Sequence, residues 1–262
     1  MAANDARTGH EAIGAAIRAA GARGAPALVA YLTAGFPSKA RFAADLAKVA
    51  ASADVVEIGV PFTDPMADGM TIQRASHAAL AQGVSLDWIL ESLRAMAPRP
   101  KAPLLLMSYL NPLLAYGLER LPAAARAAGV AGFIVPDLPY EECAELKSAL
   151  NAAGVGLVQM VTPVTPDERL AMLCAASQGF IYAVTMTGTT GKSVAVPDAV
   201  LGYLARVKAR APIPVCAGFG IRGREQVARL AGHVDGVVVG SALVEALERG
   251  DDPVAFLAGL RA

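Results

Sequence analysis

DVVEIGV, residues 54–60, is a short run of mostly β-branched residues that is apolar on both faces except for one glutamate. A strand has this pattern when both of its faces are buried, as in a parallel sheet covered by helices. Seven similar runs occur along the chain: ALVAYLT (27–33), PLLLMSY (103–109), GFIVPD (132–137), GLVQMV (156–161), FIYAVT (180–185), IPVCAG (213–218) and DGVVVG (235–240). The sequence therefore predicts eight buried parallel strands.

Segments with helical spacing separate these strands, at residues 39–51, 141–152, 167–176, 198–209 and 225–230. Ser38 is the expected N-cap of the first, and Thr165 with Glu168 forms a capping-box pattern at the third. Eight strand-and-helix units with no long linker favour a closed (β/α)8 TIM barrel over an open doubly wound sheet. We expect residues 1–262 to form one domain, with a helical extension over about residues 1–25.

The charge and composition exclude several classes of protein. The 23 basic and 23 acidic residues balance and form no basic stripe, so nucleic acid is not an expected partner. The N-terminus has no secretory pattern and no window of about 18 apolar residues could span a membrane, so we expect a cytoplasmic protein. Cys143, Cys174 and Cys216 lie in apolar surroundings and are expected to be buried thiols. The three histidines lack metal-ligand spacing, so no metal site is expected.

One interval between strands is unusually long. More than forty residues separate the run at 54–60 from the run at 103–109, whereas a βα unit typically needs about thirty. The interval begins PFTDPMADGMTIQ, after the second predicted strand. Active sites of these barrels lie at the C-terminal ends of the strands, in the loops that follow them. The extended loop after this strand is therefore the first place to look for a functional site.

Residues 57–73 hold three carboxylates, Glu57, Asp64 and Asp68, and the first and last of them are the candidates for chemistry. Glu57 lies inside the apolar strand, where a charge costs several kcal/mol unless it is paired, protonated or at the wet mouth of the barrel. Asp68 follows eleven residues later, just before Gly69. A structural ion pair for Glu57 and a turn role for Asp68 are the alternatives. Together, however, the two residues supply the pair of titratable groups that acid–base catalysis requires.

The loops after the last three strands favour a phosphate ligand. MTGTTGKS (186–193), GFGIRG (218–223) and VGSAL (239–243) are rich in glycine and hydroxyl residues, and barrels often bind phosphate at this position. Tight turns are the alternative. The GxGxxG pattern at 218–223 lacks the acidic residue of a dinucleotide site in the next strand, and the GKS at 191–193 lacks the first glycine of a P-loop. Neither motif indicates nucleotide binding.

The segment EIGVPFTDPMADGMTIQ (57–73) resembles the signature of the tryptophan synthase alpha subunit family. Further similar segments span the chain: AYLTAGFPS (30–38), SYLNP (108–112), GFIVPDLPYEE (132–142), TGTTG (187–191) and GFGI (218–221). The resemblance implies a carbon–carbon lyase of tryptophan biosynthesis. Its expected reaction is the retro-aldol cleavage of indole-3-glycerol phosphate to indole and glyceraldehyde 3-phosphate.

The resemblance also implies roles for individual residues. Glu57 would donate and accept the proton, and Asp68 would stabilise charge at the indole N–H. Tyr182 would contact the substrate, and Thr190 would pair with Asp68 when the loop that carries it closes. The indole pocket and the phosphate site would be formed by Tyr31, Tyr109 and Ile134, and by Gly191, Phe219, Gly220, Gly240 and Ser241, respectively. From the residues alone, the three tyrosines could equally form an amphipathic barrel rim.

The chain departs from common family residues at Met66, Met70, Met186 and Lys192, none of which is assigned chemistry. By resemblance, a separate beta subunit carrying pyridoxal phosphate would bind residues 61–64 and 110–112 in an alpha2beta2 heterotetramer and receive the indole. A solvent-facing rim is the alternative for this surface. No cofactor is expected in this chain itself.

Three other functions share parts of this pattern. A stand-alone lyase would release free indole, and a non-catalytic barrel would activate a synthase by binding alone, which the two intact carboxylates argue against. A different phosphosugar isomerase or aldolase is the third, and the absence of a strand-end lysine suited to a Schiff base disfavours the aldolase.

Overall fold

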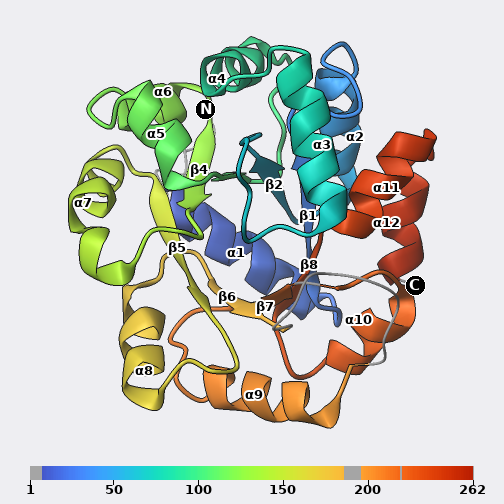
Figure 1. Ribbon diagram of the computed structural model, residues 1–262. Coiled ribbons are helices and arrows are strands. Elements are labelled where there is room, and N and C mark those ends of the chain that lie inside the picture. The colour runs from blue at the N-terminus through green and yellow to red at the C-terminus, as the bar shows by residue number, and fades with distance from the viewer. Residues whose placement is uncertain (1–7, 186–195, 219, 262) are drawn as a thin grey trace, which may run out of the picture.

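The computed structural model describes residues 8–185, 196–218 and 220–261. Its eight parallel strands close into a barrel in chain order, and the helices form a ring around them (Figure 1). The predicted fold is confirmed. The strands are β1 (Ala27–Thr33), β2 (Val55–Gly59), β3 (Leu104–Met107), β4 (Val130–Ile134), β5 (Gly156–Val161), β6 (Ile181–Val184), β7 (Val215–Gly218) and β8 (Gly236–Val239).

The helices cover the outside of the barrel and one of its ends. They are α1 (Gly9–Ala22), α2 (Phe42–Ser52), α3 (Met70–Ala81), α4 (Leu86–Ala95), α5 (Leu110–Tyr116), α6 (Leu121–Ala127), α7 (Ala144–Ala152), α8 (Asp167–Ala176), α9 (Asp198–Lys208), α10 (Arg224–Leu230), α11 (Ser241–Arg249) and α12 (Pro253–Arg261), with the short 3₁₀ helix η1 (Tyr140–Glu142). The long interval after β2 holds the loop 60–69 and two helices, so much of its extra length is helical. Among the described residues, no helix combines the length and apolar character needed to cross a membrane.

Two predicted helix caps are wrong, although α8 begins at the predicted residue. The Ser38 hydroxyl accepts the Ala40 N–H and its carbonyl accepts the Arg41 N–H, which makes a separate turn before α2 begins at Phe42. Thr165 Oγ1 accepts the Thr162 N–H at 2.9 Å instead of capping α8. In both cases a hydroxyl beside a helix start binds a local backbone group, as these side chains often do in turns.

The interior of the barrel is filled in layers, because alternate residues of each strand point inward. Val29, Val55 and Phe180 are fully buried at the start of β1, at the start of β2 and just before β6. Two residues further along the chain stand Tyr31, Glu57 and Tyr182, and Tyr31 is the register partner of Glu57. The interior thus changes from apolar to polar toward the C-terminal ends of the strands.

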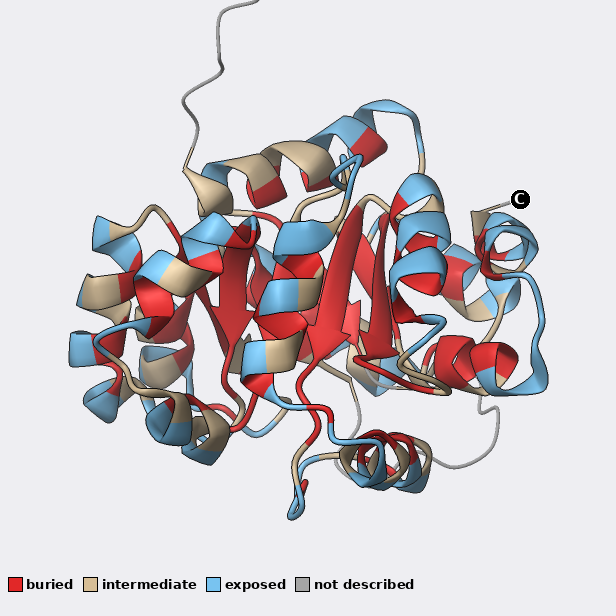
Figure 2. Cartoon of the chain, turned by 90° about the horizontal axis from the view of Figure 1, so that it is seen from above, coloured by how far each residue is buried: buried red, intermediate tan, exposed pale blue. Residues whose placement is uncertain are grey.

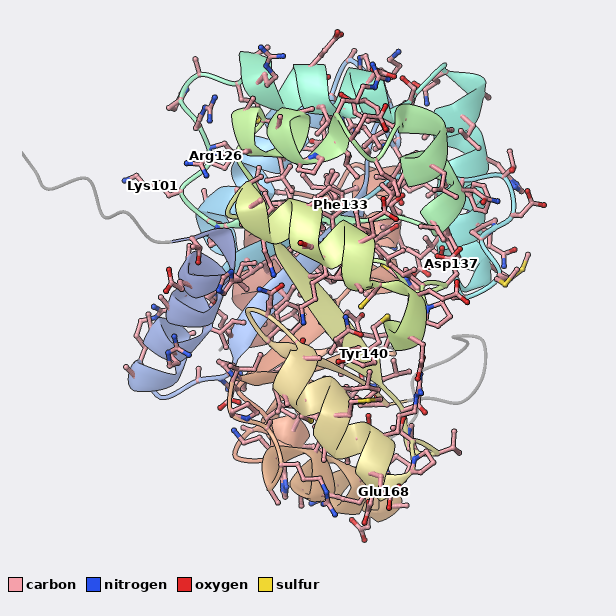
Figure 3. The ribbon with its side chains drawn as sticks, turned by 90° about the vertical axis from the view of Figure 1, so that its left-hand side faces the viewer. Lys101, Arg126, Phe133, Asp137, Tyr140 and Glu168 are labelled. Carbon is pink, nitrogen blue, oxygen red and sulfur yellow. The ribbon has the colours of Figure 1, made fainter. Side chains whose placement is uncertain are left out.

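Helix α1 lies across the N-terminal end of the barrel (Figure 2). Its Ile13 and Ile17 are fully buried and belong to the same apolar cluster as the interior residues of the strands. The side view of Figure 3 shows Lys101 and Arg126 toward this end and Asp137, in the segment after β4, toward the other. Because α1 covers one end, the loops at the opposite end are left to form a site.

Candidate active site

Glu57 is the central residue of β2 and points into the barrel, with Tyr31 and Leu105 as its register partners. It is 1% exposed, and within the described residues its Oε2 has no hydrogen-bond partner. Burial, and to a lesser extent the nearby charge of Asp68, raise the pKa of Glu57 from 4.5 to about 8. The predicted alternative of a structural ion pair is not what the structure contains, since no described cation pairs with Glu57. The residue is a buried acid that keeps its proton at neutral pH.

Asp68 lies on the loop 60–69 and is held from two sides. Its Oδ2 accepts a hydrogen bond from Tyr109 Oη at 3.1 Å, and its carbonyl accepts one from Gln73 Nε2 at 2.8 Å. Tyr109 Oη in turn accepts the Ala67 N–H at 2.9 Å. Burial raises the pKa of Asp68 to about 6, while the Tyr109 hydrogen bond lowers it. At neutral pH the two carboxyl groups therefore differ in charge, with Asp68 ionised and Glu57 protonated.

Tyr31 and Tyr182 occupy space that two glycines leave free. A Cβ added to Gly59 would lie 2.1 Å from Tyr31 Oη, and one added to Gly218 would lie 2.5 Å from Tyr182 Oη. Burial keeps the pKa of both phenols well above the usual 10, so they stay neutral. Gly59 was not singled out in the sequence, although a glycine inside a strand often marks close packing of this kind.

An apolar surface borders the two carboxyl groups. Ile134 is fully buried at the end of β4 and shares one interior cluster with Met107, Val158 and the two tyrosines. The Tyr109 ring packs on Phe62 with centroids 5.2 Å apart. Apolar and aromatic side chains of this kind are suited to contact a flat aromatic ligand.

The third part of the site is the start of α11, directly after β8. Gly240 is the N-cap and Ser241 the first residue of this helix, and a Cβ on Gly240 would lie 3.7 Å from the Tyr31 side chain. Backbone N–H groups at such a helix start bind anions. Gly220, on the neighbouring loop, has a φ of +86°, which favours glycine. Thr190, Gly191 and Phe219 lie outside the described residues, as do Met186 and Lys192.

Three side chains on the loop 60–69 and at the start of α3 face solvent. Asp64 is exposed, and its Oδ2 accepts a hydrogen bond from the neighbouring Thr63 hydroxyl. Met66 and Met70 are 83% and 70% exposed. The candidate site thus combines a protonated acid, an ionised carboxylate, apolar side chains and the N-terminus of a helix, a combination suited to proton transfer on an aromatic ligand that carries an anionic group.

Comparison with known proteins gives a consistent result. Residues 17–258 match the family model described as tryptophan synthase alpha chain. The tryptophan synthase alpha chain of Nitratidesulfovibrio vulgaris (strain DP4) is 45% identical over 92% of this chain and 94% of its own length, and that of Xanthomonas oryzae pv. oryzae (strain PXO99A) is 44% identical over 92% and 93%.

Solved structures agree. Tryptophan synthase from M. tuberculosis in an aminoacrylate-bound form has a TM-score of 0.85 at 35% identity, covering 95% of this chain and 97% of that one. Tryptophan synthase subunit alpha from Legionella pneumophila str. Paris also has a TM-score of 0.85, at 32% identity and the same coverage. The chain belongs to the tryptophan synthase alpha chain family.

Proposed function

We propose that Glu57 and Asp68 are the catalytic carboxyl groups of this chain. The reaction is that of the family: the retro-aldol cleavage of indole-3-glycerol phosphate to indole and glyceraldehyde 3-phosphate, which makes the chain a carbon–carbon lyase. The observation that carries the residue assignment is the burial of Glu57, which keeps a proton on a carboxyl group at the mouth of the barrel.

Glu57 acts first as an acid and then as a base. Its carboxyl group donates the proton to C3 of the indole ring. The bond between C3 and the glycerol side chain then breaks, and its electron pair returns to the ring. The hydroxyl on the adjacent side-chain carbon becomes the aldehyde as its proton passes back to Glu57. The residue ends the cycle protonated, which a pKa of about 8 favours at neutral pH.

Asp68 stabilises the charge that this protonation creates. Once C3 carries the proton, the ring is cationic and its N–H becomes more acidic. An ionised carboxylate beside the N–H offsets that charge in a site of low dielectric. The pKa of about 6 for Asp68, below that of Glu57, supports this division of roles.

The remaining side chains would bind the substrate. Tyr31, Tyr109 and Ile134 would line the indole pocket, and Tyr182 would contact the substrate beside Glu57. The start of α11 supports a phosphate at Gly240 and Ser241, and Gly220, on the loop after β7, would also contact it. Gly191 and Phe219 would complete the phosphate site, and Thr190 would pair with Asp68 in the closed state, as family resemblance suggests.

We also propose that a beta subunit binds at the mouth of the barrel and receives the indole in an alpha2beta2 complex. Residues 61–64 and 110–112 would form part of this surface. Met66 and Leu114 are 83% and 51% exposed and lie two residues beyond these two segments in the sequence, which supports the proposal, since exposed apolar side chains favour protein contacts. The three cysteines are buried free thiols, as predicted, and are compatible with a reducing, cytoplasmic setting.

The test is indole formation from indole-3-glycerol phosphate by the purified chain, alone and with a tryptophan synthase beta subunit. Glu57→Gln should reduce cleavage by at least about 10²-fold, the usual loss when a general acid–base group is removed. Glu141→Gln makes the same change on an exposed carboxylate paired with Arg169 and serves as the control.

Three other outcomes are informative. Fast cleavage without the beta subunit would favour the stand-alone lyase. No cleavage by the native chain under either condition would favour a barrel that activates its partner by binding alone. Full activity in Glu57→Gln would remove this residue from the mechanism.

A further inference from the structure

Glu245 joins two segments of the proposed site that are far apart in sequence. It lies on α11, one helical turn after Ser241, where α11 packs beside α3 (Figure 1). Its Oε1 accepts a hydrogen bond from Thr71 Oγ1 at 2.9 Å, and its Oε2 is paired with the Arg222 guanidinium. One carboxylate thus bridges residues 71 and 222.

The Arg222 side of the bridge belongs to the phosphate end of the site. Arg222 follows Gly220 by two residues, and its N–H donates to Gln226 Oε1 at 2.7 Å. Gln226 Nε2 donates in turn to the Gly220 carbonyl at 2.9 Å. The segment 220–223 is therefore held as a unit, and Glu245 anchors it to α11.

The Thr71 side belongs to the carboxylate end. Thr71 is the second residue of α3 and follows Asp68 by three residues. In the same turn, Gln73 Nε2 holds the Asp68 carbonyl. A shift of the first turn of α3 would therefore move the backbone of Asp68.

The bridge is partly shielded from solvent. The side chains of Glu245 and Arg222 are 25% and 34% exposed. Burial alone would raise the pKa of Glu245, but the hydrogen bonds from Arg222 and Thr71 outweigh it and lower that pKa. Glu245 is consequently ionised at neutral pH and makes charge-assisted hydrogen bonds on both sides, which are stronger than neutral ones.

We propose that Glu245 is a positioning residue that couples phosphate binding at the start of α11 and at residues 220–223 to the placement of Asp68. This inference rests on the proposed phosphate site. A phosphate that fixes residues 220–223 and the first turn of α11 fixes Glu245, and Glu245 then holds Thr71 and the loop before it. Coupling between two sites is reciprocal, so a change at Thr71 must alter phosphate affinity as well.

The experiment is calorimetric titration of the full chain with inorganic phosphate. Thr71→Val keeps the shape of the side chain and removes its hydroxyl, and it should weaken phosphate binding about fivefold, although residue 71 belongs to the carboxylate end. Thr71→Ser keeps a hydroxyl at this position and should bind phosphate with the affinity of the native chain. In turnover with a beta subunit, Arg222→Gln should lower kcat as well as raise KM.

The matched control is Arg74→Gln. Arg74 pairs with Glu248 at 2.6 Å between the same two helices, one turn further from the site. This variant should leave phosphate affinity and kcat unchanged. Equal weakening by Arg74→Gln would assign the effect to general packing of α3 on α11 and overturn the specific bridge.

Two further results are decisive. If Thr71→Val binds phosphate with the affinity of the native chain, the coupling is overturned and the proposed function is left intact. Failure of the native chain to bind phosphate, with indole formation intact, would overturn the phosphate site and the coupling with it.

Discussion

The two ends of the barrel are built from the same strands but differ in what covers them. At the N-terminal end, Ile13 and Ile17 of α1 seal an interior of Val29, Val55 and Phe180. At the C-terminal end, two residues further along the chain, Tyr31, Glu57 and Tyr182 face the loops. Among these described residues, the barrel interior thus changes from apolar at the end covered by α1 to polar at the end that carries the loops.

Glycines make room at both ends, for different neighbours. A Cβ on Gly156 would lie 2.7 Å from His10 Cβ of α1, and a Cβ on Gly59 would lie 2.1 Å from Tyr31 Oη. The first glycine admits a helix, whereas the second admits a side chain of the proposed site. Closely packed backbone therefore serves stability at one end and the site at the other.

The largest effect on stability is expected when the ionisable group is removed from the polar end of the barrel interior. In Glu57→Gln a neutral amide replaces the carboxyl group, so residue 57 can no longer ionise. The unfolded chain releases the Glu57 proton near pH 4.5 and the folded chain near pH 8, so native stability falls as pH rises through this window. At pH 8.5 the variant should be more stable than the native chain by on the order of 4 kcal/mol.

Urea unfolding at pH 5 and pH 8.5 measures this difference. The gain should be small at pH 5 and large at pH 8.5. A gain that does not change with pH would show that Glu57 ionises normally in the folded chain. Glu141→Gln, on the exposed surface, should show no such gain.

A truncation at the closed end should give the opposite pattern, a loss of stability with no loss of activity. Ile17→Ala removes a fully buried side chain from the seal and should cost about 3 kcal/mol. Urea unfolding and the rate of indole formation at 25 °C check this. A fall in kcat larger than the unfolded fraction explains would show that the closed end also shapes the site.

Substitutions of Gly59 and Gly156 compare the two ends by adding a single methyl group to each. Gly59→Ala and Gly156→Ala should each cost about 2 kcal/mol, because the added methyl group overlaps a neighbour that must move. Only Gly59→Ala should lower kcat/KM, since it displaces the Tyr31 ring. Equal activity losses in the two variants would show that the contact with Tyr31 has no special role.

The sequence predicted strands and helices better than it predicted the contacts within the candidate site. The limits of β1, β5 and α8 match their predicted ranges, because apolar runs and helix formers are local signals. The family resemblance implied that Tyr109 lines the indole pocket. The sequence did not predict that the Tyr109 hydroxyl binds Asp68, forty-one residues earlier, and it did not single out Gly59 or Glu245. Such contacts depend on which segments meet across the barrel, and no local pattern encodes that.

The smallest expected effect concerns Tyr109. The native profile of kcat/KM should rise near pH 6 as Asp68 ionises and fall near pH 8 as Glu57 loses its proton. The Tyr109 hydrogen bond lowers the pKa of Asp68, so Tyr109→Phe should move the acid limb to higher pH by less than about one unit, leaving the basic limb in place.

Tyr203→Phe is the matched control for this shift. It removes a phenolic oxygen that donates to the Val161 carbonyl at 2.8 Å, away from both carboxyl groups. Each variant should lose about 1 kcal/mol of stability, the net value of one hydrogen bond. Only Tyr109→Phe should move the acid limb. A shift of both limbs together would instead indicate that Tyr109 affects the pKa values of Asp68 and Glu57 alike. The separate roles of the two carboxyl groups would then need another physical basis.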